Sequence, residues 1–192
     1  MNRRDAITRV GLLVGGTVIG AEAFLSGCVK RSAEEVSKIG FSDNDVFFLD
    51  EVGESILPAT ASSPGAKAAG IGEFMKTIVA DCYEEKDQKI FMEGINLLQN
   101  ASQQKFNKRF AELSADEKHE LLVILDTEAK DHSKNKNDEE PAHYFTMIKQ
   151  LTLWGYFTSE VGSTKALRYV PIPGRYDGCT DYVKGDKAWA EI

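Results

Sequence analysis

The first 28 residues limit which part of the chain can belong to the folded domain. Arg3 and Arg4 are followed by an uncharged run from Val10 to Ala21, and small residues then lead to Cys28. A basic start, an apolar core and a small-residue cleavage zone are typical of a secretory signal peptide. The apolar core is shorter than the ~20 residues of a membrane-spanning helix. We therefore expect residues 1–27 to be removed and the fold to begin after them.

The last residues of this leader predict a lipid anchor. Leu25-Ser26-Gly27-Cys28 resembles a bacterial lipobox, in which the cysteine thiol is acylated before cleavage on its N-terminal side. The alternative is an ordinary signal peptide followed by a chance cysteine. Stable anchoring takes more than one acyl chain, each buried methylene contributing ~0.8 kcal/mol. We expect a periplasmic-side, extracytoplasmic protein that is held on a bacterial membrane through lipid on Cys28.

The arginine pair bears on the export pathway. Twin-arginine signals export proteins that are already folded, often with a cofactor in place. Asn2-Arg3-Arg4-Asp5-Ala6-Ile7 keeps the pair but lacks the large apolar residue that this signal usually carries two positions later. Twin-arginine export and Sec export therefore both stay open.

Charge restricts the partners of the mature chain. The whole chain of 192 residues has a net charge of −7, and residues 1–27 carry three arginines and two carboxylates. The remaining 165 residues therefore carry −8, and they are enough for one domain with a core. An acidic surface argues against binding of nucleic acid and against adhesion to anionic lipid.

Apolar periodicity predicts a single all-α domain over residues 42–168, after a lipid anchor and polar tether at 28–41. Ser42 and a capping box at 114–117 mark two helix starts, and Pro58 ends the first helix. The charged stretch 132–140 is expected to be a linker, and Pro141 the first residue of the last helix. The expected helices cover about residues 43–57, 71–83, 86–106, 115–131 and 141–160.

Two of these helices carry further predictions. The helix at 71–83 places Phe74, Ile78 and Cys82 four residues apart, which predicts that Cys82 faces the core. The helix at 141–160 is apolar over most of its circumference. Such a helix is buried, either in the centre of the domain or at a subunit interface.

The sequence changes character at residues 169–192. Tyr169–Cys179 contains two prolines, two glycines and two tyrosines, which excludes a regular helix and predicts an extended, ordered arm. Strand signals are confined to 170–172 and 181–184. Tyr, Trp and Arg are enriched in interface hot spots, although each aromatic side chain could instead belong to the core. The predicted interface residues are Trp154, Tyr156, Tyr169, Pro171, Pro173, Arg175 and Tyr176.

Two cysteines remain once Cys28 is assigned to the anchor. In an oxidising compartment Cys82 and Cys179 can pair with each other, one of them can bond a partner chain, or both can stay free. The sequence leaves these three alternatives open.

The residues predict no catalytic, cofactor-binding or metal-binding site in this chain. His119, His132 and His143 lack the i, i+4 spacing of paired metal ligands, and each is expected to be solvated. Gly70-Ile71-Gly72 lacks the third glycine and the preceding strand of a dinucleotide-binding turn. Gly-x-Ser-x-Gly does not occur.

Several blocks resemble a known family. The first block runs from Phe47-Phe48-Leu49-Asp50 through Ile56-Leu57-Pro58-Ala59-Thr60 to the small-residue run at 63–71. The others are residues 151–162, Leu-Thr-Leu-Trp-Gly-Tyr-Phe-Thr-Ser-Glu-Val-Gly, and the arm at 169–179. Together they are similar to the small (third, or gamma) subunit family of gluconate 2-dehydrogenase. The resemblance spans most of residues 43–180, and residues 84–140 match only as generic helices.

The resemblance implies an accessory role. In that family the small subunit has no redox group and helps a large flavin-containing subunit to mature and be exported. The large subunit oxidises a sugar or sugar acid, often with a cytochrome c subunit as electron acceptor. The resemblance thus implies no cofactor in this chain and FAD in its partner. Members usually lack a lipobox, so Cys28 suggests that this chain anchors the complex. The alternative is a stand-alone, lipid-anchored helical binding or assembly protein.

Overall fold

The computed structural model describes residues 40–137, 140–172, 174–176 and 178–191. The predictions for the signal peptide, Arg3, Arg4, Cys28 and Pro173 lie outside these residues, as does most of the tether. The described part contains five α-helices: α3 (Asp43–Ile56), α4 (Ile71–Cys82), α5 (Glu85–Phe106), α6 (Ala115–Asn135) and α7 (Tyr144–Thr158). The predicted helical fold is confirmed.

Shorter elements complete the described chain. Two 3₁₀ turns, η1 (Ala66–Ala69) and η2 (Phe110–Glu112), lie in the loops before α4 and α6. A π-helical turn, η3 (Gly162–Ala166), follows α7. Two strands of three residues, β1 (Arg168–Val170) and β2 (Trp189–Glu191), form a parallel pair in the C-terminal arm. The strand signal at 170–172 is thus confirmed in part, whereas residues 181–184 form no strand.

Both predicted helix starts are capping boxes in the structure. The Ser42 hydroxyl accepts from the Asp45 N–H, and the Asp45 carboxylate accepts from the Ser42 N–H at 2.9 Å. Ser114 and Glu117 repeat the arrangement, with 2.8 Å from the Ser114 N–H to the Glu117 carboxylate. That backbone donor, with the Lys108 ammonium, lowers the pKa of Glu117 to about 2.

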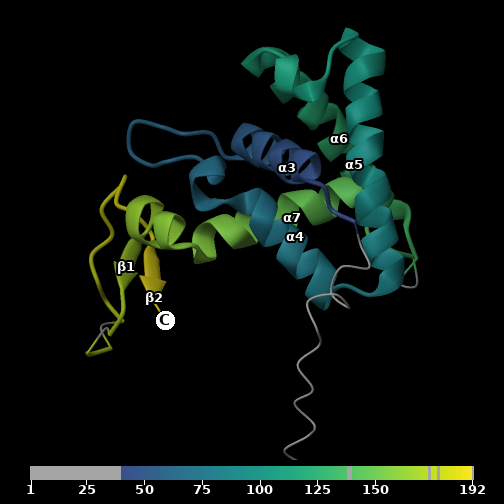
Figure 1. The fold of residues 1–192 in the computed structure, drawn as a ribbon. Helices are drawn as coiled ribbons and strands as arrows, with labels where there is room; N and C mark the ends of the chain where they lie inside the picture. Colours follow the sequence, from purple (N-terminus) through teal and green to yellow (C-terminus); the bar gives the residue numbers. More distant parts are fainter. Residues whose placement is uncertain (1–39, 138–139, 173, 177, 192) are drawn as a thin grey trace, which may run out of the picture. The chain divides into compact units, whose positions relative to one another are not determined.

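The helix that is apolar on most sides lies in the centre of the described domain. α7 packs against α3, α4, α5 and α6, and Figure 1 shows it running among them. Burial of one large apolar side chain is worth about 1.5–3 kcal/mol relative to its exposure in water. α7 therefore supplies the common surface on which the other helices pack. Its buried side chains include Tyr144, Phe145, Met147, Ile148, Leu151 and Tyr156.

The structure corrects the boundary between α6 and α7. α6 continues to Asn135, so residues 132–135 are helical rather than part of a linker. Ion pairs between residues three or four apart, such as Lys134 with Asp131 at 3.0 Å, support this exposed end. α7 begins at Tyr144 and not at Pro141. His143 is the cap, because its Nδ1 accepts the Phe145 N–H at 3.2 Å.

The face of α4 that meets the core was also predicted wrongly. Two apolar stripes lie side by side on this helix, one through Met75 and Val79 and one through Phe74 and Ile78. The structure buries the first stripe completely and the second only in part. Cys82 continues the second stripe beyond the core, and its thiol is exposed and free.

The loop between α3 and α4 is fixed by side chains from α3 and α7. The Glu54 carboxylate accepts hydrogen bonds from the backbone N–H groups of Ala59 and Lys67, both at 2.9 Å. The Tyr156 hydroxyl donates to the Pro64 carbonyl at 2.5 Å. Tyr156 is only 3% exposed, so its predicted position at a partner interface is wrong: it belongs to the domain's own core.

Two histidines, which were expected to be solvated and separate, meet where α6 contacts the start of α7. The rings of His132 and His143 lie 5.7 Å apart, and both are half-buried. Among the described residues, His132 Nδ1 is buried without a hydrogen-bond partner. Burial lowers the pKa of His143 below its ordinary 6.5, and repulsion from His132 acts in the same direction.

Because His132 and His143 are close together and half-buried, we expect the folded protein to lose stability in mild acid. Because the folded state depresses the pKa of His143, the unfolded chain binds the proton more readily, and stability falls as the pH drops below about 6.5. His143→Asn keeps an N-cap acceptor for the Phe145 N–H without a titrating group. As the pH is lowered from 7.5 to 5.5, we expect the urea midpoint of unfolding to fall less in the variant than in the wild type. An identical fall in both proteins would assign the acid sensitivity to other groups.

Candidate partner interface

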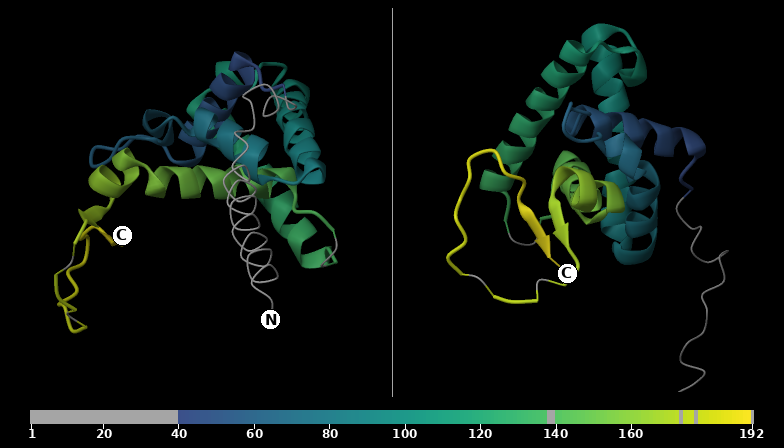
Figure 2. Two further views of the ribbon diagram at one scale, coloured as in Figure 1. Left: turned by 60° about the horizontal axis from the view of Figure 1, so that its bottom comes forward. Right: turned by 90° about the vertical axis from the view of Figure 1, so that its left-hand side faces the viewer.

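The C-terminal arm starts directly at the end of α7. After η3 the chain enters β1, leaves the sheet over residues 171–188 and returns as β2. The pairing is parallel, with Arg168 opposite Trp189 and Val170 opposite Glu191. Figures 1 and 2 show both strands beyond the end of α7 and the segment between them extending away and returning.

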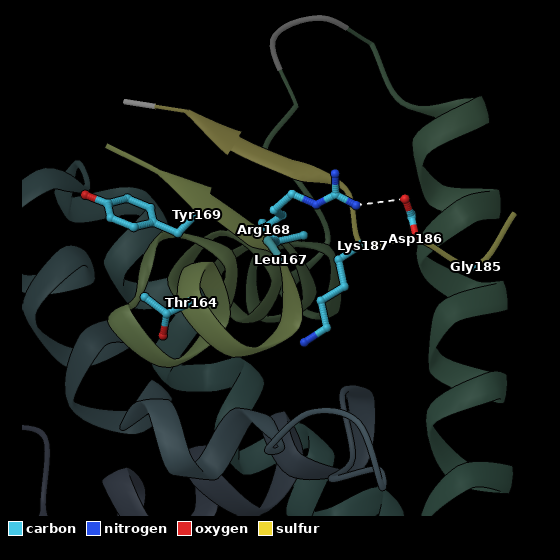
Figure 3. A pocket seen from close by; sticks show the side chains of 7 residues that line it. All are labelled: Thr164, Leu167, Arg168, Tyr169, Gly185, Asp186 and Lys187. Atoms are coloured by element: carbon cyan, nitrogen blue, oxygen red, sulfur yellow. Dashed lines mark hydrogen bonds and ion pairs between the residues drawn. The ribbon is translucent and has the colours of Figure 1, made fainter. Parts of the chain in front are cut away.

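Charged side chains hold the two strands together. The Arg168 guanidinium lies 2.9 Å from the Asp186 carboxylate and stacks over the Trp189 ring at 4.4 Å. The Lys187 ammonium donates to the Lys165 carbonyl. An open pocket of about 560 Å³ lies between η3 and the returning segment (Figure 3), and it is lined by Thr164, Leu167, Arg168, Tyr169, Gly185, Asp186 and Lys187. Local contacts therefore join the two ends of the arm, whereas the order of the Tyr169–Cys179 segment stays a prediction.

The arm exposes large apolar side chains instead of burying them. Ile172, Tyr176 and Tyr182 are 81%, 97% and 87% exposed, and more than half of Val183 and Trp189 is exposed as well. Large apolar side chains that are exposed on one short segment are typical of a surface that binds something. This cluster of five residues, 172, 176, 182, 183 and 189, is called the arm cluster below.

A second apolar surface lies on the neighbouring helix. Leu153, Trp154 and Phe157 are exposed on one side of α7, where Phe157 neighbours the other two because it follows them by four and three residues. Trp154 packs the edge of its ring against Phe74 of α4 at 5.4 Å, so part of its area is already used within the domain. These three residues form the α7 rim, which leads through η3 to the arm.

Most of the predicted interface residues are thus accessible. Trp154, Tyr169, Pro171, Arg175 and Tyr176 are exposed, whereas Tyr156 is buried as described above. The sequence interpretation missed Tyr182, Val183 and Trp189. The aromatic residues at 182 and 189 are the signal in the sequence that could have indicated this part of the surface.

Two features of the described residues bear on cofactor binding, the grouping of metal-ligating side chains and the turn at the start of α4. They contain no group of three or more His, Cys, Asp or Glu side chains that could hold a metal. At the start of α4 the Gly72 N–H donates to the Asp50 carboxylate at 2.8 Å. A side chain at Gly72 would also collide with the Val46 carbonyl, so this glycine allows α3 and α4 to approach closely. The turn at 70–72 is therefore occupied by the packing of α4 on α3.

Cys82 and Cys179 are both exposed free thiols in the structure. Their pairing, with each other or with a partner, stays a prediction.

Comparison with known sequences identifies the family. The sequence model described as gluconate 2-dehydrogenase subunit 3 matches residues 43–174, which include all five described helices and the first part of the arm. Searches of curated proteins and of solved structures found no match. No helix among the described residues has the length and apolar character needed to cross a membrane. The matched span covers well over half of the chain, which therefore belongs to the gluconate 2-dehydrogenase subunit 3 family, the small subunits of a dehydrogenase complex.

Proposed function

We propose that this chain is the non-catalytic small subunit of a membrane-associated, flavin-dependent sugar or sugar-acid dehydrogenase. It helps the large flavin subunit to mature and be exported, and it anchors that subunit to the membrane through lipid on Cys28. FAD is bound by the large subunit, and a cytochrome c subunit can accept the electrons. Family membership supports the dehydrogenase complex.

The arm cluster carries the proposal. It offers five large apolar side chains on a segment whose two ends pair as β1 and β2, with β1 packed on η3. Interfaces gain most of their binding energy from a few such aromatic side chains. Because the backbone is held by β1 and β2 before binding, less conformational entropy is lost on association. We infer that the arm cluster and the α7 rim together contact the large subunit.

The test is purification of the native complex through a tag on this chain. We expect a second, larger polypeptide that carries the flavin absorbance and the dye-linked sugar oxidation. After dissociation, this chain alone is expected to show neither property. Turnover by the isolated chain would contradict the accessory role, and a lone membrane-bound chain without any partner would favour the stand-alone lipoprotein.

The anchor is tested separately. Replacing Cys28 by Ala is expected to move the protein, with its partner, from the membrane fraction to the soluble periplasmic fraction, since the acidic domain has little attraction for anionic lipid. Mass spectrometry of the wild-type chain should show the acyl chains. The anchor assignment fails if the wild type carries no acyl mass and the Cys28→Ala protein stays on membranes after a high-salt wash.

A further inference from the structure

A groove lies between α3, the second half of α5 and η2. Its floor is formed by Phe48 and Phe110, which are almost fully buried and meet edge to face with ring centres 5.6 Å apart. Its volume is about 550 Å³, which lies within the range of ~300–1,000 Å³ that small-molecule sites have. Because η2 packs against both α3 and α5, the walls of the groove belong to the helical domain and not to the arm.

Amide side chains line this groove from two helices. Asn44 lies on α3, whereas Gln99, Asn100 and Gln103 lie on α5, where Gln103 follows the other two by four and three residues and shares their face. Residues 96–107 contain six Asn and Gln and one charged side chain, so this part of the helix surface is polar but almost uncharged. Among the described residues, the side chains of Asn44, Gln99 and Asn100 have no hydrogen-bond partner. Their donors and acceptors are therefore available to a ligand.

The described residues that line the groove present no unpaired charge. They include no lysine and no carboxylate, and their one cation, Arg109, donates from Nε to the Glu112 carboxylate at 2.9 Å. This guanidinium also holds the pKa of Glu112 below its ordinary value, so both groups stay charged and neutralise each other. The whole chain carries −7, and Asp43 and Asp45 flank Asn44. An anion would thus find no unpaired cation in the groove, and the surroundings would repel it.

One wall of the groove is an accessible aromatic ring. Phe47 follows Asn44 by three residues on α3 and is 52% exposed. The Lys67 ammonium lies over the Phe47 ring at 5.0 Å and takes one face, which leaves the other face for a ligand. The face of an aromatic ring is negative, and it attracts C–H groups that carry partial positive charge. This wall therefore suits a ring compound that presents C–H groups on its faces.

We propose that the groove between α3, α5 and η2 binds a neutral sugar ring. A sugar ring presents C–H groups on its faces and hydroxyl groups around its rim. Each hydroxyl donates and accepts, and a carboxamide offers both functions, so Asn44, Gln99 and Asn100 pair with the hydroxyls while Phe47 packs on a face of the ring. The inference does not depend on the proposed function, because the groove is separate from the arm and can be tested on this chain alone.

A peptide is a poorer match for the groove. Peptide-binding domains use a strand edge, an apolar groove for a helix, an aromatic groove for proline-rich segments or a cluster of arginines. The described lining of this groove contains no strand, one accessible aromatic ring and one arginine, which is paired with Glu112. Its most numerous side chains are amides, which match the many hydroxyls of a sugar.

Titration of the purified chain with sugars, followed by proton–nitrogen NMR, tests the inference. The probes are D-glucose, D-galactose and D-mannose. We expect at least one of them to shift the side-chain NH₂ signals of Asn44, Gln99 and Asn100, with a Kd of about 2 mM for a ligand of this size. D-Glucuronate has the ring of glucose with a carboxylate in place of the hydroxymethyl group. It should bind at least about threefold more weakly than glucose, because no free cation pairs with it.

Variants with matched controls locate the site. Asn100→Leu keeps the size of the side chain but removes its donors and acceptor, and we expect it to weaken binding at least about tenfold. Asn96→Leu makes the same change one turn earlier on α5, outside the groove, and should bind like the wild type. Phe47→Leu should also weaken binding, whereas Phe47→Tyr keeps the ring and should not. Both asparagines are exposed, so their variants should unfold within about 2 °C of the wild type.

Three results would overturn the sugar site. The first is no binding of any of the three hexoses at about 50 mM, far above the expected Kd. The second is binding that shifts signals outside the groove, or that is equally tight in Asn100→Leu and Asn96→Leu. The third is glucuronate binding as tightly as glucose. Each of these leaves the subunit role intact, whereas a chain that binds sugar in the groove but has no larger partner would overturn the proposed function alone.

Discussion

Replacing Ile172, Tyr176 and Tyr182 together by serine is expected to weaken binding of the large subunit by at least about 100-fold. A hot-spot side chain contributes about 2 kcal/mol or more, and two such residues already account for a loss of this size. Stability should hardly change, because the three side chains are 81%, 97% and 87% exposed in the chain alone. The unfolding midpoint should stay within about 2 °C of the wild type.

A matched control comes from the other helices. Leu97, Val123 and Ile124 are exposed apolar residues on α5 and α6, away from the arm. Their triple serine variant also removes three apolar side chains, which are 51%, 49% and 38% exposed, and it should bind the large subunit normally. Affinities are measured by titration of the labelled subunit. Equal losses in both variants, or none in the arm variant, would show that the arm cluster is not the binding surface.

The largest effect on stability is expected at Gly94, where α5 crosses the start of α7. A methyl group at this position would lie 2.6 Å from Cγ of Tyr144, far inside the ~3.5 Å separation of carbon atoms in contact. The obstacle is the base of a buried side chain on a packed helix, which cannot turn away. Gly94→Val should therefore cost about 3 kcal/mol and lower the unfolding midpoint by about 10 °C.

Asn96→Val provides the comparison for this variant. It introduces the same side chain two residues further along α5, at an exposed position. We expect its midpoint to stay within about 2 °C of the wild type. If Gly94→Val lowered the unfolding midpoint no more than Asn96→Val, α5 and α7 could move apart with little loss of stability. The packing described for the core would then be wrong. Thermal unfolding followed by circular dichroism makes the comparison.

The helices were predictable because local signals set them. Ser42 with Asp45 and Ser114 with Glu117 start their helices through contacts within four residues, which a sequence displays directly. The predicted ends of α6 and α7 were wrong because other contacts, also within three residues, outweighed the signals used to place them. His143 caps α7 in place of Pro141 as its first residue, and ion pairs extend α6 through residues that resemble a linker.

The surfaces were harder to predict than the elements. Tyr156 and Tyr176 have the same side chain, yet one bonds the Pro64 carbonyl in the core and the other is almost fully exposed. Likewise α4 carries two apolar stripes, and only packing against α3 and α7 selects the one that is buried. Periodicity locates a stripe, but the position of the neighbouring helices decides which stripe they cover.

The central place of α7 also determines when this protein can fold during its synthesis. Residues 144–158 are translated last among the five described helices, and they supply the surface on which the other four pack. A nascent chain that ends near residue 140 therefore lacks the surface that α7 gives to α3, α4, α5 and α6, and helices of this length are marginal alone. Ribosome-bound chains ending at residue 140 should be digested rapidly by protease, whereas chains in which α7 has emerged should resist. The polypeptide then stays open to chaperones or to a translocation channel until almost all of it has been made.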